Sequence, residues 1–519
     1  MRIKNSLLNM FYGIIGQVIS IVLGFVVRTV FIFVLGVEYL GIDGLFTSIL
    51  MMLALANLGF DTAMIFSLYK PLAENDTHKI QAYMNLYKKA YRIIGLIVLV
   101  IGAGLWPFIP YFINGEVKVD HINSIYFLFL INSVSSYYLI YKHALLIADQ
   151  KNHIISKTHI SFTIISNILQ VLFLLLVKNY LIVLSIQLFF RILENYIISK
   201  KVDQLYPYIK LKNSATLSIK ERKEFFSNLY ALFLYKLSAF VINGTDNILL
   251  SIFFGIAIVG VYSNYLLIIS TIISIASYLF YSVTASIGNL INSEDTEKKY
   301  FIFRVLNFTN FCVYGFCAVC LWFLLNPFIV IWLGEDLVLN QIVVLFIVLN
   351  FFTAGMQNAP TTYRETTGLF KKGKYRPVIA AMINIFSSIL FIKTFGVVGV
   401  FMGTIFSRLC TYFWYDPFVI FKYTFKRPVK EYFIRMMYYY ALLLVILVGL
   451  EILFSFVAFD NTLLTFLIKL FLCTIIPNLV IYMAFRRSEE LTYLLNIMKP
   501  LINKSFNGLY VREVKQSSN

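Results

Sequence analysis

Long apolar runs separated by short polar segments dominate the pattern of the 519-residue chain. A helix needs about 20 mostly apolar residues to cross the hydrocarbon core of a bilayer. The runs 157–199 and 376–417 are each about twice that length, so each must turn, near 178–180 and near 393–396. The fourteen predicted spans lie near 8–35, 45–69, 91–113, 122–146, 157–177, 181–199, 225–253, 262–287, 303–332, 338–361, 376–395, 397–417, 436–457 and 462–485.

The composition supports the same class of protein. Hydrophobic residues make up 60% of the chain and charged residues 13%, whereas an average soluble domain has roughly 25% charged residues. A soluble globule has too little interior to bury so much apolar surface. These values exclude a disordered chain, a collagen-like fibre and a disulfide scaffold, and they argue strongly against a soluble enzyme. The five cysteines lie inside apolar runs, where we expect reduced, packed thiols rather than metal ligands.

Basic residues alternate between the two sides of the predicted bundle. With a cytoplasmic N-terminus, 36 of the 44 Lys and Arg residues fall in cytoplasmic segments and three fall in outer loops. This asymmetry follows the positive-inside rule, and a wrong number of spans would scramble it. The net charge of +18 therefore reflects membrane orientation rather than nucleic-acid binding. We expect both termini in the cytoplasm and the basic tail on the anionic inner leaflet.

The two halves of the chain resemble each other at a shift near 219 residues. Gly36 and Gly41 match Gly255 and Gly260 at that shift. Because the shift covers six spans, an even number, both halves start on the same side of the membrane, as in a parallel repeat. Further matches occur in the same order: Pro107–Ile109 with Pro327–Ile329, Gly115 with Gly334, Tyr141 with Tyr363, Lys142 with Arg364, and Arg191 with Arg408.

We therefore predict an all-α integral membrane protein with 14 transmembrane helices. It comprises two parallel-repeat six-helix lobes and two C-terminal helices outside the repeat. Two lobes joined by a hydrophilic linker suit a rocking type of alternating access, with a site between the lobes. The predicted parts are the N-lobe 1–199, the basic cytoplasmic linker 200–224, the C-lobe 225–422, the last two spans 423–485 and the basic cytoplasmic tail 486–519.

Charged side chains inside the spans are the candidate substrate-binding residues. A charge at the bilayer centre costs about 2.5–3.5 kcal/mol on insertion scales, so these side chains must face a water-filled cavity or one another. Arg28 and Asp246 lie at matching depths of spans 1 and 7, and Arg191 and Arg408 at matching depths of spans 6 and 12. The candidates are Arg28, Asp246, Arg191, Arg408 and Lys236.

Two interpretations of these charges stay open. In the functional one, the arginines line a cationic cavity for an anionic substrate, because the planar guanidinium donates two hydrogen bonds to a phosphate. In the structural one, Arg28 neutralises Asp246 and Arg191 pairs with Glu194, three residues further along its helix. Asp246 is alternatively a proton or cation site.

Signatures of cofactor-dependent chemistry are absent from the sequence. It contains neither the phosphate loop Gly-x-x-x-x-Gly-Lys-Ser/Thr nor the zinc motif His-Glu-x-x-His. The five histidines fall in loops or at span ends and form no ligand cluster. We expect no cofactor, no metal ligands and no catalytic residues. Coupling of transport to a proton or to Na⁺ stays open.

Five short motifs carry a resemblance to a known group. They are Gly24–Thr29, Leu35–Gly41, Leu58–Ala63, Thr245–Leu250 and Val259–Ser263. With these motifs the chain, over about 5–485, resembles the polysaccharide-transporter branch of the multidrug/oligosaccharidyl-lipid/polysaccharide (MOP) exporter superfamily, which includes Wzx-type flippases.

The resemblance implies a function at the bacterial cell membrane. Members flip a polyprenyl-diphosphate-linked oligosaccharide to the outer leaflet, using a rocking cycle and a cationic central cavity. Arg28 matches the first-span arginine expected to meet the diphosphate, and the two added spans match the lipid-tail groove of related lipid II flippases. Expected partners are the lipid-linked glycan, membrane lipids, a polysaccharide polymerase and glycosyltransferases. The alternatives are a cation-coupled drug or metabolite exporter of the same superfamily and, less favoured, a membrane glycosyltransferase.

Overall fold

The structure of the chain is a computed structural model. It describes residues 2–53, 60–115, 119–210, 244–293, 295–367, 375–456 and 462–497, and a few residues between these ranges. Every regular element within the described ranges is helical, which confirms the predicted all-α class. Twelve of the described helices are long and apolar enough to cross a membrane. The predicted spans 45–69 and 225–253 run partly outside the described residues, so the count of 14 stays a prediction.

Both turns predicted from span length are present. Helix α7 (Asn152–Val177) ends at Lys178, whose φ of 54° reverses the chain. Asn179 then caps α8 (Tyr180–Leu205), because its side-chain oxygen accepts a hydrogen bond from the Leu181 amide at 2.8 Å. In the second case α15 (Arg376–Phe395) ends at Gly396, whose φ of 58° together with ψ of −137° is readily adopted only by a residue without a side chain.

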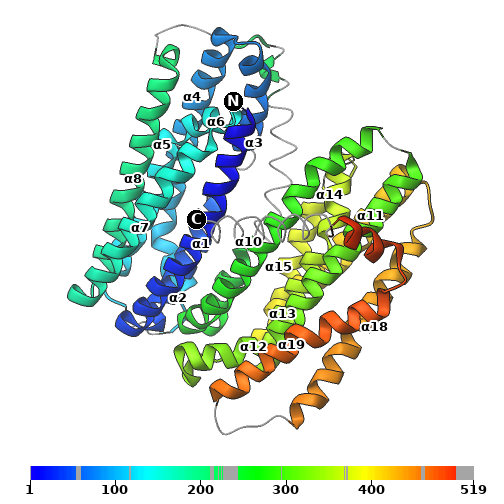
Figure 1. Cartoon of the computed structure of the whole chain (residues 1–519). Helices are drawn as coiled ribbons and strands as arrows, with labels where there is room; N and C mark the ends of the chain where they lie inside the picture. The colour runs from blue at the N-terminus through cyan, green and yellow to red at the C-terminus, as the bar shows by residue number, and fades with distance from the viewer. Residues whose placement is uncertain are drawn as a thin grey trace, which may run out of the picture. The chain divides into compact units, whose positions relative to one another are not determined.

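The chain divides into two compact units, and the first consists of Met1–Leu267 with Lys374–Gly403. Helices α5 and α8, and helices α7 and α8, run side by side within it, and α7 also packs along α1 (Figure 1). Its helices are α1 (Arg2–Leu35), α2 (Val37–Leu53), α3 (Phe60–Ala73), α4 (Thr77–Leu105), α5 (Ile122–Leu139), α6 (His143–Ala148), α7, α8, the helix Gly244–Phe254, the start of α10 (Ile256–Ser293), α15, and the start of α16 (Val397–Cys410).

The second unit consists of Ile268–Gly373 with Thr404–Asn519. Its last helix, α19, packs against α12 and α18 at the edge of the unit (Figure 1). Its elements include the remainders of α10 and α16, α11 (Thr296–Asn310), α12 (Phe316–Leu333), α13 (Gln341–Met356), α14 (Asn358–Thr366), α17 (Tyr412–Ile420), α18 (Lys430–Ser455) and α19 (Thr462–Phe485). The lobe boundaries predicted at 199, 225 and 422 stay predictions.

A reciprocal backbone contact supports the predicted repeat. A Cβ atom added to Gly41 would overlap the carbonyl oxygen of Ile256, and one added to Gly260 would overlap the carbonyl oxygen of Val37. Gly260 and Ile256 each lie 219 residues beyond Gly41 and Val37. The start of α2 and the start of α10 therefore meet through equivalent atoms, as two copies of one motif related by a two-fold axis would.

Each unit also contains a buried or partly buried ion pair between a basic residue of the repeat and an aspartate. Lys142 bonds Asp203 at 2.6 Å in the first unit, and Arg364 bonds Asp416 at 2.7 Å in the second. Each basic residue follows a buried tyrosine that belongs to the repeat, Tyr141 or Tyr363. Arg364 and Asp416 are only 2% and 1% exposed. Breaking such a buried pair is costly, so both pairs tie their helices together.

Candidate functional site

Arg28 lies near a carboxylate and a phenol in the first unit. The side chains whose charge acts on it are Asp43 in α2 and Tyr180 at the start of α8. The Tyr180 hydroxyl donates a hydrogen bond to Asp43 Oδ1 at 2.7 Å. The Tyr180 ring packs edge-on against Phe31, with a 5.0 Å separation between ring centroids. The Nη1 atom of Arg28 is buried and has no hydrogen-bond partner among the described residues.

The break at Gly36 brings Arg28 and Asp43 together. Gly36 adopts a φ of 90°, which ends α1 and lets α2 start in a new direction. Arg28 lies eight residues before Gly36 and Asp43 seven residues after it, so each is about 10–12 Å from the break at 1.5 Å per residue. Asp43 lies between the predicted spans 8–35 and 45–69, where an outer loop was expected. Asp43 and Arg28 lie at nearly the same distance from Gly36 along the chain, and this spacing was the signal that could have identified Asp43 as the partner of Arg28.

Asp246 has a different environment from the one that pairing with Arg28 would give. It is buried in the helix Gly244–Phe254, and its charge acts on Tyr262 of α10. The next residue, Asn247, donates a hydrogen bond to the Ser48 hydroxyl of α2 at 3.0 Å. Helix Gly244–Phe254 is thus held against α2 by polar contacts within the first unit, while Asp43 is the acid beside Arg28.

Arg191 lines a polar cavity between α5, α7 and α8. Glu194 acts on Arg191 electrostatically, but Glu194 Oε1 also lies 3.0 Å from His159 Nδ1. A direct pair between Arg191 and Glu194 stays a prediction, and the contact of Glu194 with His159 was not predicted from the sequence. The cavity has a volume of about 240 Å³ and is lined by Asn132, Phe162, Thr163, Ser166, Asn167, Gln170, Gln187, Phe190, Arg191 and Glu194.

The two remaining candidates, Arg408 and Lys236, stay predictions. Arg408 lies in the last turn of α16 and belongs to the second unit, whereas Arg28, Arg191 and Asp246 belong to the first. Lys236 lies outside the described residues. No three His, Cys, Asp or Glu residues in the described ranges lie close enough together to hold a metal ion.

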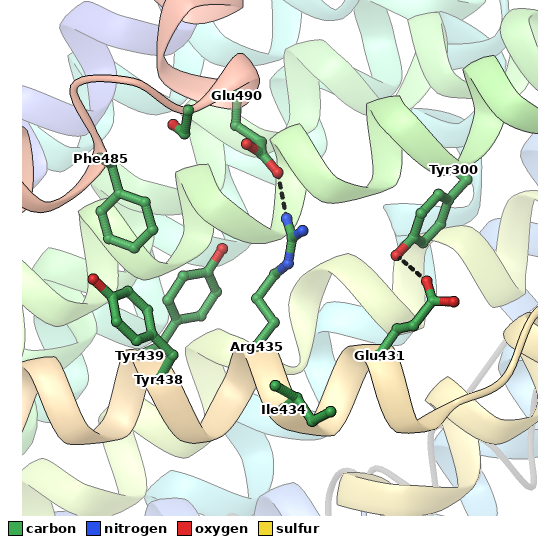
Figure 2. A pocket seen from close by; sticks show the side chains of 9 residues that line it. Tyr300, Glu431, Ile434, Arg435, Tyr438, Tyr439, Phe485 and Glu490 are labelled. Atoms are coloured by element: carbon green, nitrogen blue, oxygen red, sulfur yellow. Dashed lines mark hydrogen bonds and ion pairs between the residues drawn. The ribbon is translucent and has the colours of Figure 1, made fainter.

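A larger pocket of about 550 Å³ lies in the second unit, where α11 and α18 meet the segment after α19 (Figure 2). Arg435 points from α18 to Glu490, and Glu431 accepts a hydrogen bond from Tyr300 at 2.8 Å (Figure 2). Glu490 also bonds Arg304 at 2.6 Å. Two arginines from two helices thus hold one carboxylate at the edge of the pocket. This contact was not predicted, because its residues lie far apart in the sequence.

The Glu490 contact leads to a pH-dependent prediction. Burial alone would raise the pKa of Glu490, but hydrogen bonds from its own backbone, Arg304 and Arg435 outweigh burial and hold the pKa below its ordinary value. A carboxyl with a lowered folded-state pKa stabilises the fold above its unfolded pKa, about 4.3, and loses that contribution as the pH falls through its folded pKa. We expect Glu490→Gln to increase hydrogen exchange in 488–497 at pH 7, with the difference from wild type shrinking as the pH falls below about 4.3.

Glu489→Gln is the matched control for this experiment. The Glu489 side chain is 71% exposed and lies 3.3 Å from Arg304, so water screens the pair and its loss has little effect. Equal protection of 488–497 in wild type and Glu490→Gln at pH 7 would contradict the assigned role.

Comparison with known proteins places this arrangement in a fold class. No protein-family model and no curated protein matches the chain. The lipid II flippase MurJ, in an inward closed conformation, matches with a TM-score of 0.63 and 17% identity, over 92% of this chain and 99% of that chain. A variant of the Vibrio cholerae MATE transporter VcmN matches with a TM-score of 0.54 and 12% identity, over 82% and 99%.

A third structure has the same architecture. It is a multidrug resistance MATE family transporter of the MOP superfamily in an inward-facing conformation, with a TM-score of 0.51 and 11% identity, over 77% of this chain and 94% of that chain. At such identities the similarity shows the fold alone. The chain therefore has the helical fold that these three solved transporter structures share.

Proposed function

We propose that the chain flips a polyprenyl-diphosphate-linked oligosaccharide repeat unit across the bacterial plasma membrane by alternating access. The product feeds the synthesis of a surface polysaccharide such as capsule, O-antigen or exopolysaccharide. Glycosyltransferases build the substrate before this step and a polysaccharide polymerase uses it afterwards. Both termini of the chain lie in the cytoplasm, and the protein is a transporter rather than an enzyme.

The Arg28 cluster is the observation that carries this proposal. Asp43 partly balances the charge of Arg28, which lowers the cost of keeping a guanidinium inside a membrane protein. The buried Nη1 atom lacks a hydrogen-bond acceptor among the described residues. A buried donor without an acceptor costs about 1–3 kcal/mol, and a phosphate oxygen satisfies it with a charge-assisted bond. Arg28 is therefore suited to an anionic group that is present for part of a transport cycle.

The fold and the remaining candidates add support. A solved structure with this fold has the name lipid II flippase, so the architecture can serve a lipid-linked substrate. Arg191, Asp246, Arg408 and Lys236 are the further candidates for contacts with the diphosphate or its sugars. In this proposal Arg28 binds the diphosphate, the group that every such lipid shares, and the others contribute selectivity.

Reconstitution of the full-length protein tests the proposal. The probe is a fluorescent polyprenyl-diphosphate-linked sugar in liposomes, whose outward-facing fraction is quenched by a membrane-impermeant reagent. We expect the protein to accelerate exchange of the probe between leaflets relative to protein-free liposomes. The proposal is wrong if the exchange rate is unchanged. Drug efflux from cells without an effect on surface glycan would favour the exporter alternative, and sugar transfer by the purified protein would favour a glycosyltransferase.

A further inference from the structure

A polar seam runs along the facing surfaces of α7 and α8. Its members follow each other at intervals of four and three residues, which places them on one face of each helix. The two helices pack side by side within the first unit (Figure 1). The seam consists of His159, Thr163, Ser166 and Gln170 on α7 and Gln187, Arg191 and Glu194 on α8.

Hydrogen bonds connect most of the seam. Gln187 donates to the Gln170 side-chain oxygen at 2.9 Å, and Gln170 donates to the Ser166 hydroxyl at 2.9 Å. At the other end of the seam His159 Nδ1 lies 3.0 Å from Glu194 Oε1. Both helices are apolar enough to span a membrane. His159 lies about 10 Å from the Asn152 end of α7 at 1.5 Å per residue, and its side chain is 57% exposed whereas that of Glu194 is 18% exposed.

The cavity beside the seam can hold water. Its volume of about 240 Å³ exceeds the roughly 30 Å³ that one water occupies in the liquid. The amides and hydroxyls that line it offer the several polar partners that a buried water needs. Water can therefore reach the His159–Glu194 pair along the seam, which a proton requires in order to enter and leave.

Few other charges face the pair. Arg191 interacts electrostatically with His159, and His143 on α6 with Glu194. From α5 the cavity receives the neutral Asn132. Helix α1, which packs against α7, contributes no residue to the cavity lining. Arg191 thus balances the charge of Glu194 whether His159 is protonated or neutral. His159 is the group of this site that can change its charge at little cost, because the ordinary histidine pKa lies near 6.5.

We propose that His159 and Glu194 form the proton-binding site that couples transport to a proton gradient. A proton from water in the cavity binds the neutral imidazole, which gives an imidazolium–carboxylate pair. The same proton later leaves to water, so one proton is bound and one released per cycle. Helix α8 links this site to Arg28, because Tyr180, Gln187 and Glu194 lie on one face at seven-residue intervals. The inference goes beyond the proposed function, since it holds for any substrate.

Nuclear magnetic resonance of the full-length protein in nanodiscs, with carbon-13-labelled histidine, tests proton binding without a substrate. His159→Gln assigns the signal of His159. We expect that signal to titrate between pH 5 and 8 and its midpoint to move by about 1 pH unit in Glu194→Gln. It should stay in place in Glu297→Gln, whose carboxylate pairs with Arg427 in the second unit. A signal that does not titrate in this range, or an unmoved midpoint in Glu194→Gln, overturns the proposal.

Export measured in cells at pH 6 and pH 8 tests the coupling. The protonated fraction of an ordinary histidine changes by roughly 25-fold between these values, so we expect wild-type export to depend on pH. His159→Gln should remove the dependence, Glu194→Gln should shift it along the pH scale, and Glu194→Asp should keep it. His153→Gln is the control, because His153 Nδ1 lies 3.0 Å from the side-chain oxygen of Asn9 and not beside Glu194. Equal pH dependence in wild type and His159→Gln refutes coupling. Absence of glycan export in wild type would refute the proposed function alone. The proposed proton site would still be tested by the titration of His159, because that measurement uses no substrate.

Discussion

Arg28→Ala is expected to abolish glycan export while leaving insertion of the protein in the membrane intact. The substitution removes the charge and the fork of donors proposed to bind the diphosphate. Loss of a charge-assisted hydrogen bond costs about 1.5–3 kcal/mol, or roughly 10-fold to 150-fold in affinity. Arg28→Lys should restore export only in part, because lysine keeps the charge but not the planar fork. The measurement is surface polysaccharide in a strain that depends on this chain, at matched protein levels.

A double variant separates substrate binding from internal charge balance. Arg28→Ala alone leaves Asp43 without the cation beside it, which by itself can destabilise the protein. Arg28→Ala with Asp43→Asn removes both charges and should recover protein level and thermal stability without recovering export. Arg487→Ala, at an exposed position after α19, is the control and should export normally. Export by the double variant at the wild-type level would mean that Arg28 serves only to neutralise Asp43.

Gly41→Ala and Gly260→Ala are expected to have the second largest effect. In each variant the new methyl group would overlap a backbone carbonyl oxygen, of Ile256 or of Val37. Backbone cannot move aside as a flexible side chain can, so the starts of α2 and α10 must separate. Overpacking of this kind typically costs about 1–3 kcal/mol. We expect a lower midpoint of thermal unfolding in detergent and a loss of export in both variants.

Gly24→Ala is the matched control for these two substitutions. Gly24 lies within α1, and a Cβ atom there would meet nothing within 4 Å. Alanine is also favoured over glycine in a helix by about 1 kcal/mol, so this variant should unfold at the wild-type temperature or above. If Gly41→Ala and Gly260→Ala behave like Gly24→Ala, the reciprocal contact between α2 and α10 is not needed for stability or transport.

Hydrophobic periodicity and span length predicted most of the fold. The turns at Lys178 and Gly396 followed from the thickness of a bilayer, because the apolar runs that contain them are about twice as long as one span. The shift of 219 residues predicted which glycines are equivalent, and Gly41 and Gly260 make equivalent contacts. These features are local, or they repeat along the chain, and therefore leave a trace in the order of the residues.

Long-range pairs of charges could not be predicted in the same way. Arg364 and Asp416 are 52 residues apart, and neither segment carries a pattern that points to the other. Arg364 falls between the predicted spans 338–361 and 376–395, where a cytoplasmic segment is expected, although its side chain is buried. The acid beside Arg28 was also not predicted, because equal depth in the repeat favoured Asp246 whereas the break at Gly36 brings Asp43 close. Depth along a helix follows from sequence, but the direction of a side chain depends on packing.

The most direct test of the central claim is the affinity of Arg28 variants for the diphosphate group. Binding of polyprenyl diphosphate and polyprenyl monophosphate to the full-length protein in nanodiscs is compared between wild type and Arg28→Ala with Asp43→Asn. We expect wild type to bind the diphosphate more tightly than the monophosphate, and the double variant to bind the diphosphate at least about tenfold more weakly than wild type does. Equal affinity of both proteins for the diphosphate would contradict the account.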